Sequence, residues 1–140
     1  ICRDEIFGFL GHNGAGKTTT ISLMSGELPL DGGEIKYNLS EQTLCVGNGQ
    51  NQAIRQRIGV CPQHDILFGD LSCRETLRLF AKLKGGLQTN PGETTSQAVE
   101  RQVEKSIRQV KFTSPGDEDK PVKTFSGGMR RKVSIAIAML

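Results

Sequence analysis

The 140-residue sequence lacks three features that would each point to a class of function. Its four cysteines include no C-x-x-C pair, which favours buried thiols over a zinc site or a disulfide framework. No apolar run approaches the ~20 residues that a membrane-spanning helix needs. Eighteen basic against 15 acidic residues leave a net charge of +3, which is too small to argue for nucleic acid or a membrane surface as a partner.

Glycine is abundant instead, and its most informative cluster is the stretch 11–18, GHNGAGKT, which fits the pattern G-x-x-x-x-G-K-[ST]. Glycines allow successive backbone N–H groups to point into one concavity that binds anions. A helix that follows such a loop directs the positive end of its dipole to the same place. Lys17 adds a charge that can reach the outer phosphates, and the Thr18 hydroxyl can bind Mg²⁺. The stretch therefore predicts a polyphosphate-binding site.

The segments around this loop predict an α/β fold. Residues 5–10 (EIFGFL) form a nearly unbroken apolar run, which is typical of a parallel strand buried on both faces. A helix is predicted over 17–25, with Gly26 just beyond its end. An alternating strand at 34–39 suggests an antiparallel pair, and a second short buried strand is expected at 58–61, ended by a proline.

The second half of the chain predicts amphipathic helices. A capping box, Ser72 with Glu75, opens a helix that ends at Gly85-Gly86. Residues 94–110 predict another helix, whose charged face is most simply a solvated surface. The acidic segment 116–119 is most simply a surface loop.

Residues 125–129 (FSGGM) open the last predicted helix, and three cations follow in its first turns: Arg130, Arg131 and Lys132. Positive charge is slightly unfavourable beside a helix N-terminus. Two interpretations are open at this point. The cations form an anion-binding surface behind the Ser-Gly-Gly loop, or they are ordinary basic residues that face solvent.

Three stretches in this order resemble the nucleotide-binding domain of ABC transporters: residues 11–20 (GHNGAGKTTT), 58–65 (IGVCPQHD) and 126–132 (SGGMRRK). In that family they are the Walker A motif, the Q-loop and the signature motif. Phe125 and Met129 stand where the family usually has Leu and Gln, and the methionine is familiar in subfamily A, the group associated with lipid export. The resemblance spans nearly the whole chain. It implies a P-loop NTPase fold of the ABC type with an antiparallel β edge, a helical subdomain at about 72–125, and the signature motif with its helix at 125–140.

The resemblance also implies the ligands and the residues that hold them. Two such domains close head to tail over two molecules of ATP with Mg²⁺. The ATP bound in cis would be held by Asn13, Gly14, Ala15, Gly16, Lys17, Thr18 and Thr19. The ATP of the second domain would be covered in trans by Ser126, Gly127, Gly128 and Met129. Thr18 and Gln63 would bind Mg²⁺, and Gln63 would also position the attacking water.

The resemblance further implies that the intact protein hydrolyses ATP to drive transport, with lipids as the cargo, at the cytosolic face of a membrane. Its partners would be a second nucleotide-binding domain and the transmembrane domains of the same transporter, with no nucleic acid. Two alternatives stay open: a soluble ABC ATPase without membrane domains, and a non-hydrolysing ATP-binding ABC domain. We expect the sequence to be incomplete at both ends, because the resemblance implies that the aromatic residue that stacks on adenine would precede Ile1, and that the Walker B aspartate and the catalytic glutamate would follow Leu140. These 140 residues alone are therefore predicted to be inactive.

Overall fold

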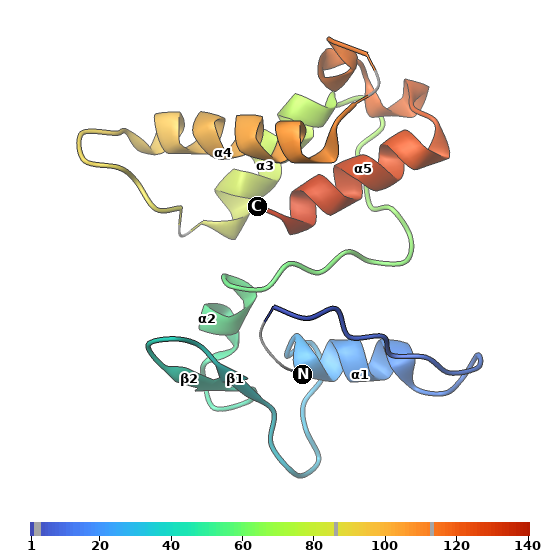
Figure 1. Ribbon diagram of the computed structural model, residues 1–140, viewed down its shortest axis with the longest axis vertical. Helices are drawn as coiled ribbons and strands as arrows, with labels where there is room; N and C mark the ends of the chain where they lie inside the picture. The colour runs from blue at the N-terminus through green and yellow to red at the C-terminus, as the bar shows by residue number, and fades with distance from the viewer. Residues whose placement is uncertain (2–3, 86, 113) are drawn as a thin grey trace. The chain divides into compact units, whose positions relative to one another are not determined.

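The computed structural model describes residues 1, 4–85, 87–112 and 114–140, which divide into two compact units, 1–57 and 58–140. The first unit contains α1 (Lys17–Met24), β1 (Lys36–Asn38), β2 (Thr43–Cys45) and α2 (Asn51–Arg55), as Figure 1 shows. The strands form an antiparallel pair, which confirms the strand predicted within 34–39. The hydroxyl of Tyr37 on β1 donates to the carbonyl of Met24 at 3.0 Å and so ties the sheet to the end of α1. The buried apolar side chains of this unit are Leu44, Val46 and Ile54.

The two buried strands predicted at 5–10 and 58–61, the first of them parallel, are wrong. Neither segment forms a strand, and the one sheet of the described residues is the β1–β2 pair. Ile6 and Leu10 are 103% and 91% exposed. An apolar run becomes a buried strand only where neighbouring strands complete its hydrogen bonds and other elements cover its faces. The described residues provide such a neighbour to neither segment, so the predicted parallel α/β layer is absent from them.

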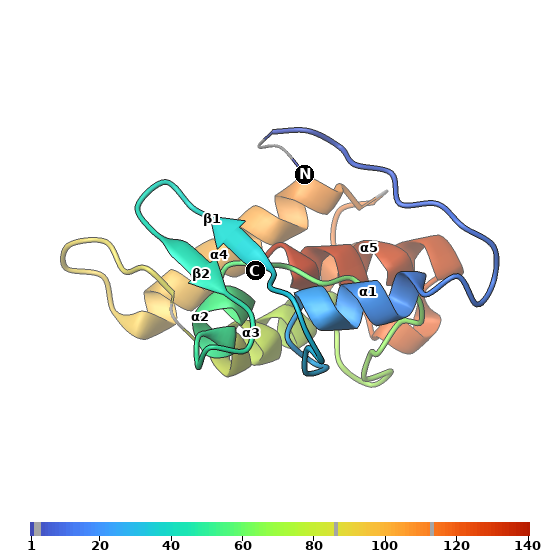
Figure 2. The ribbon, with the colours of Figure 1, turned by 90° about the horizontal axis from the view of Figure 1, so that it is seen from below.

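The second unit is helical. It contains α3 (Cys73–Lys84), α4 (Thr95–Val110) and α5 (Gly127–Ala138), with two short 3₁₀ turns, η1 (Asp117–Asp119) and η2 (Val122–Thr124). The three long helices pack against one another in pairs, and Figure 2 shows α4 and α5 from a second side. Their shared core includes Leu77, Val103, Val122, Phe125 and Val133. Within the described residues, no helix is both long and apolar enough to cross a membrane.

Capping boxes fix where α3 and α4 begin. The Ser72 hydroxyl accepts from the Glu75 amide at 3.1 Å, and the Glu75 carboxylate accepts from the Ser72 amide at 2.8 Å, as the sequence predicts. Thr94 and Gln97 form the same reciprocal pair at the start of α4. Both predicted helices are confirmed. Gly85 ends α3 with a φ of 63°, whereas Gly86, also named in that prediction, lies outside the described residues.

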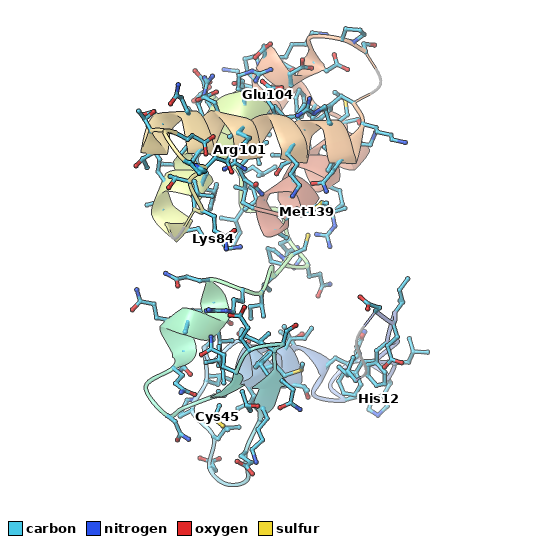
Figure 3. All side chains as sticks on the ribbon, turned by 60° about the vertical axis from the view of Figure 1, so that its left-hand side comes forward. His12, Cys45, Lys84, Arg101, Glu104 and Met139 are labelled. Atoms are coloured by element: carbon cyan, nitrogen blue, oxygen red, sulfur yellow. The ribbon has the colours of Figure 1, made fainter. Side chains whose placement is uncertain are left out.

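The charged face of α4 is exposed to solvent, as the sequence suggests, and its side chains also form ion pairs. Figure 3 labels two of its members, Arg101 and Glu104. Arg101 pairs with Glu93 at 2.8 Å, and Glu104 accepts from Arg74 of α3. The acidic segment is also more ordered than a surface loop, because Asp117 is buried within η1.

Candidate functional site

The loop at residues 11–16 curls through two glycines. Gly14 and Gly16 have φ of 83° and 84°, a left-handed conformation that side chains other than glycine rarely adopt. The amide of Ala15 donates to the carbonyl of His12 at 3.2 Å, which closes a turn in the loop. A Cβ added to Gly11 would lie 2.9 Å from the Ala15 Cβ, so a glycine is also needed where the loop begins. The sequence pattern thus produces the tight curl that it predicts.

Lys17 reaches back across this loop from the first residue of α1. Its Nζ donates to the carbonyl oxygens of Gly11 at 2.7 Å and His12 at 2.8 Å. The ammonium group therefore lies beside the loop backbone and not in bulk solvent. A lysine held in this way places a positive charge at a defined point of the loop.

The N-terminus of α1 is open to a ligand. Its N-cap is Gly16, and none of the described side chains caps the helix there. The first turn carries no acid, and Thr18 and Thr19 are exposed. The first amides of a helix have no partner within the helix, and together with its dipole they favour an anion. A glycine curl, an uncapped helix and a tethered lysine are the chemistry that fits a polyphosphate.

The opposite end of α1 is held by α2, which the sequence did not predict. Arg55 donates from Nη2 to the carbonyl of Gly26 at 2.6 Å and from Nε to that of Ser25 at 3.4 Å. Gly26 is the predicted residue beyond the helix, with a φ of 68°, and a Cβ there would lie 2.8 Å from the Asn51 side chain. A cation at a helix C-terminus is favourable because it meets the negative end of the dipole. No local sequence pattern predicts the contact of Arg55 with Gly26, because the two residues are 29 positions apart.

The second unit contains the other predicted site residues. Gln63 is exposed and lies just after Pro62. Ser126 is the N-cap of α5, and its hydroxyl accepts from the Met129 amide at 3.3 Å. Gly127 and Gly128 are exposed, and added Cβ atoms would meet nothing within 4 Å. The structure thus confirms that the Ser-Gly-Gly loop opens a helix, and the space beside its two glycines is open.

The three cations that follow this loop bind backbone carbonyls of their own unit. The Nη1 atom of Arg130 donates to Phe125 at 2.7 Å, and the Nζ atom of Lys132 donates to Lys111 at 2.6 Å. Arg131 donates to the carbonyl of Pro62. Of the two open interpretations, neither describes these side chains fully, because each of them also holds a loop in place.

The predicted site residues fall into two groups that the structure describes separately. Residues 13–19 lie in the first unit, whereas Gln63 and residues 126–129 lie in the second. A magnesium site shared by Thr18 and Gln63 therefore stays a prediction. Among the residues that the structure describes, no three His, Cys, Asp or Glu side chains are grouped as a metal site. The contacts of Arg55 and Arg131 were missed because both join residues that are distant in sequence.

Comparisons with known proteins identify the family of this chain. The family model described as "ABC transporter" matches residues 1–140. The chain is 43% identical over 140 residues to "ABC transporter A family member 9" and 39% identical to "ABC transporter A family member 2", both of Arabidopsis thaliana. Each match covers 100% of this chain and 13% of the relative. It is also 37% identical over 139 residues to "ATP-binding cassette sub-family A member 2" of Rattus norvegicus, which covers 99% of this chain and 5% of that protein.

The chain thus spans about an eighth of the length of the plant relatives, and less of the rat one. The match to the family model nevertheless includes every residue, from the loop at 11–18 to the helix that follows Ser126. With subfamily A relatives aligned over the same length, the chain belongs to the ABC transporter family.

Proposed function

We propose that this chain binds ATP through residues 11–19 as the nucleotide-binding part of an ABC transporter. The observation that carries the proposal is the N-terminus of α1, where Gly16 provides no side-chain cap and Lys17 is tethered across the glycine loop. A triphosphate supplies the negative charge that such a helix end lacks. The family match supports the same ligand.

The proposed site residues are those that the sequence indicates. ATP is held in cis by Asn13, Gly14, Ala15, Gly16, Lys17, Thr18 and Thr19. Thr18 and Gln63 offer oxygen atoms to Mg²⁺, which prefers such ligands and which, when bound, offsets phosphate charge as a Lewis acid. Ser126, Gly127, Gly128 and Met129 cover the ATP of a second nucleotide-binding domain. Exposure of the two glycines supports this role, because a phosphate needs close access to their amides.

We assign hydrolysis and transport to the intact transporter. In this proposal the chain lies at the cytosolic face of a membrane, residues 72–125 form a helical subdomain, and the partners are a second nucleotide-binding domain and the transmembrane domains. The names of the relatives favour a transporter over a soluble ABC ATPase. The most specific part of the proposal is a lipid cargo, which follows from the resemblance to subfamily A.

Two substitutions in the intact transporter test the site. Lys17→Ala removes the tethered charge, and we expect ATP affinity to fall about 10- to 100-fold, since a hydrogen bond to a charged group contributes about 1.5–3 kcal/mol. Ser126→Ala should preserve binding in cis and abolish turnover. Equilibrium binding of a fluorescent ATP analogue and release of phosphate measure the two effects.

Lys36→Ala is the matched control, because this exposed lysine of the same unit pairs with Glu34 on the surface. It should leave ATP affinity unchanged. If Lys17→Ala and Lys36→Ala bind ATP equally well, the proposed site is wrong. Full turnover in Ser126→Ala would overturn the role in trans.

A further inference from the structure

The segment 59–65, which contains Gln63, runs close to α5 at three successive points and is bonded to it at the last two. A Cβ added to Gly59 would overlap the carbonyl oxygen of Ala138, at the C-terminal end of the helix. Farther along, Arg131 donates from Nη1 to the carbonyl of Pro62. The first contact is a close approach that only a glycine allows, and the second is a hydrogen bond from the Arg131 side chain to the backbone of the segment.

The third point of attachment is a side-chain cluster of Asp65, Arg131 and Ser134. The hydroxyl of Ser134 donates to Oδ1 of Asp65 at 2.7 Å, and Nη1 of Arg131 lies 3.6 Å from the same oxygen. Arg131 and Ser134 are three residues apart and so share one face of α5. One arginine thus contacts the segment on both sides of Gln63, through Pro62 and through Asp65.

Burial makes this cluster more than a surface ion pair. Ser134 is 3% exposed, so its hydroxyl would lose its partner if Asp65 were removed. Asp65 and Gln63 are both exposed residues, but the Asp65 side chain is only 24% exposed, because it lies against Arg131 and Ser134. The segment is therefore held to the helix at residues 62 and 65, on either side of Gln63.

The same helix begins at Ser126. α5 is one continuous helix of 12 residues, about 18 Å long at 1.5 Å per residue, and the cluster lies in its first half and middle. A helix transmits a displacement as a rigid rod, so movement of the Ser-Gly-Gly loop carries residues 62–65 with it. The contacts of Pro62 and Asp65 with Arg131 and Ser134 are sufficient for this coupling between the segment and the helix.

We propose that Asp65, Arg131 and Ser134 are positioning residues that hold Gln63 in a fixed relation to the Ser126 loop, so that the two phosphate-facing groups move as one body. The inference rests on the proposed function. It assigns a role in turnover to three side chains that are not among the residues expected to contact ATP or Mg²⁺. Their loss should leave the loop at 11–18 intact and impair the step that needs Gln63 correctly placed.

The test uses the intact transporter with Asp65→Ala, Ser134→Ala, Arg131→Ala and Arg131→Lys. A misplacement of about 1 Å can cost up to about 100-fold in rate, and we expect kcat for ATP to fall at least about tenfold in the alanine variants. The dissociation constant of the fluorescent ATP analogue should stay within about twofold, because Lys17 is untouched. Arg131→Lys should recover part of the rate. The double variant of Asp65 and Ser134 should be no slower than either single variant, since the two share one interaction.

Asp70→Asn is the matched control. It removes a carboxylate charge five residues farther along, where the side chain is 89% exposed and pairs with Lys123. Its kcat should equal that of the unchanged protein. Equal kcat in Asp65→Ala and Asp70→Asn would overturn the proposal, as would a loss of ATP affinity with kcat unchanged.

Hydrogen exchange distinguishes failure of this proposal from failure of the proposed function. Without nucleotide, peptides covering 59–66 should exchange faster in Asp65→Ala and Ser134→Ala than in Asp70→Asn. Faster exchange in a protein that binds no ATP would mean that the attachment exists and that the nucleotide assignment is wrong. Unchanged exchange would refute the attachment itself.

Discussion

Replacing Arg74 by methionine tests whether the charged contact between α3 and α4 stabilises the second unit. The Arg74 side chain is 19% exposed and faces three carboxylates. Its Nε donates to Asp119 at 2.8 Å, its Nη1 donates to Glu104, and its Nη2 lies 3.8 Å from Glu118. The hydrogen bond with Asp119 is the main reason that the pKa of Arg74 is raised above its ordinary value. Methionine keeps much of the side-chain packing and removes the charge.

The magnitude follows from burial on each side of the contact. Removing one partner of a fully buried ion pair costs about 3–5 kcal/mol, because the other charge is left uncompensated. Here the Glu104 and Asp119 side chains are 44% and 58% exposed, so water screens much of the remaining repulsion. We therefore expect a loss of about 2 kcal/mol, which is about a 30-fold rise in the population of the locally opened state.

Arg78→Met is the matched control on the same helix. Arg78 makes one bidentate pair, with Glu100, in which both side chains are 40–46% exposed, so its loss should cost less than about 1 kcal/mol. Hydrogen exchange of α3 and α4 peptides in the intact transporter measures both losses. Glu104→Gln in the Arg74→Met background should restore part of the protection, as should added salt. Equal losses at Arg74 and Arg78, with no effect of salt, would refute the reasoning.

Two further predictions concern the start of α3. The Ser72 amide donates to the Glu75 carboxylate and lowers the pKa of Glu75 in the folded protein. The ionised Glu75 therefore stabilises the helix fully above its ordinary pKa, and this stabilisation is lost as the pH falls through the lower pKa of the folded protein. Hydrogen-exchange protection of the first turn of α3, corrected for the intrinsic pH dependence of exchange, should therefore decrease as the pH falls through this range. In Glu75→Gln the protection should not change with pH there. The same pH dependence in both proteins would contradict the role of Glu75 in the cap. Burial raises the pKa of the Cys73 thiol to about 12, so iodoacetamide at pH 8 should leave it unmodified while the half-buried Cys45 and Cys61 react first. Peptide mass spectrometry measures each site, and alkylation of Cys73 at the rate of the other two would show that the helix start opens readily.

The features that the sequence predicted correctly are those that depend on near neighbours in the chain. Gly26 ends α1 because a left-handed residue is needed there, and the Ser72–Glu75 box starts α3 through atoms three residues apart. The loop at 11–16 belongs to the same class, since its curl depends on the φ angles of Gly14 and Gly16. Such signals can be recognised in one window of sequence, without knowledge of the rest of the fold.

The features that were missed or wrong depend on distant residues. The apolar run at 5–10 indicates side chains that favour burial, yet it contains no information on which strand would pair with them. Arg55 and Arg131 resemble any exposed basic residue in sequence, but each donates to carbonyls far along the chain. Their roles follow from the path of the backbone, which periodicity and composition do not encode.

The two proposed phosphate-facing helices differ in a way that fits their separate roles. α1 begins at a glycine without a side-chain cap, so its first amides are free to bind a ligand that stays in place. α5 begins at Ser126, whose hydroxyl already accepts from the Met129 amide, which leaves Gly127 and Gly128 as the amides for a phosphate. When an external anion leaves, a helix N-terminus whose amides are partly hydrogen-bonded by its own cap loses fewer hydrogen bonds than an uncapped one. The self-capped helix therefore suits the proposed contact with a second domain, which forms and breaks, and the uncapped helix suits the proposed binding of ATP in cis.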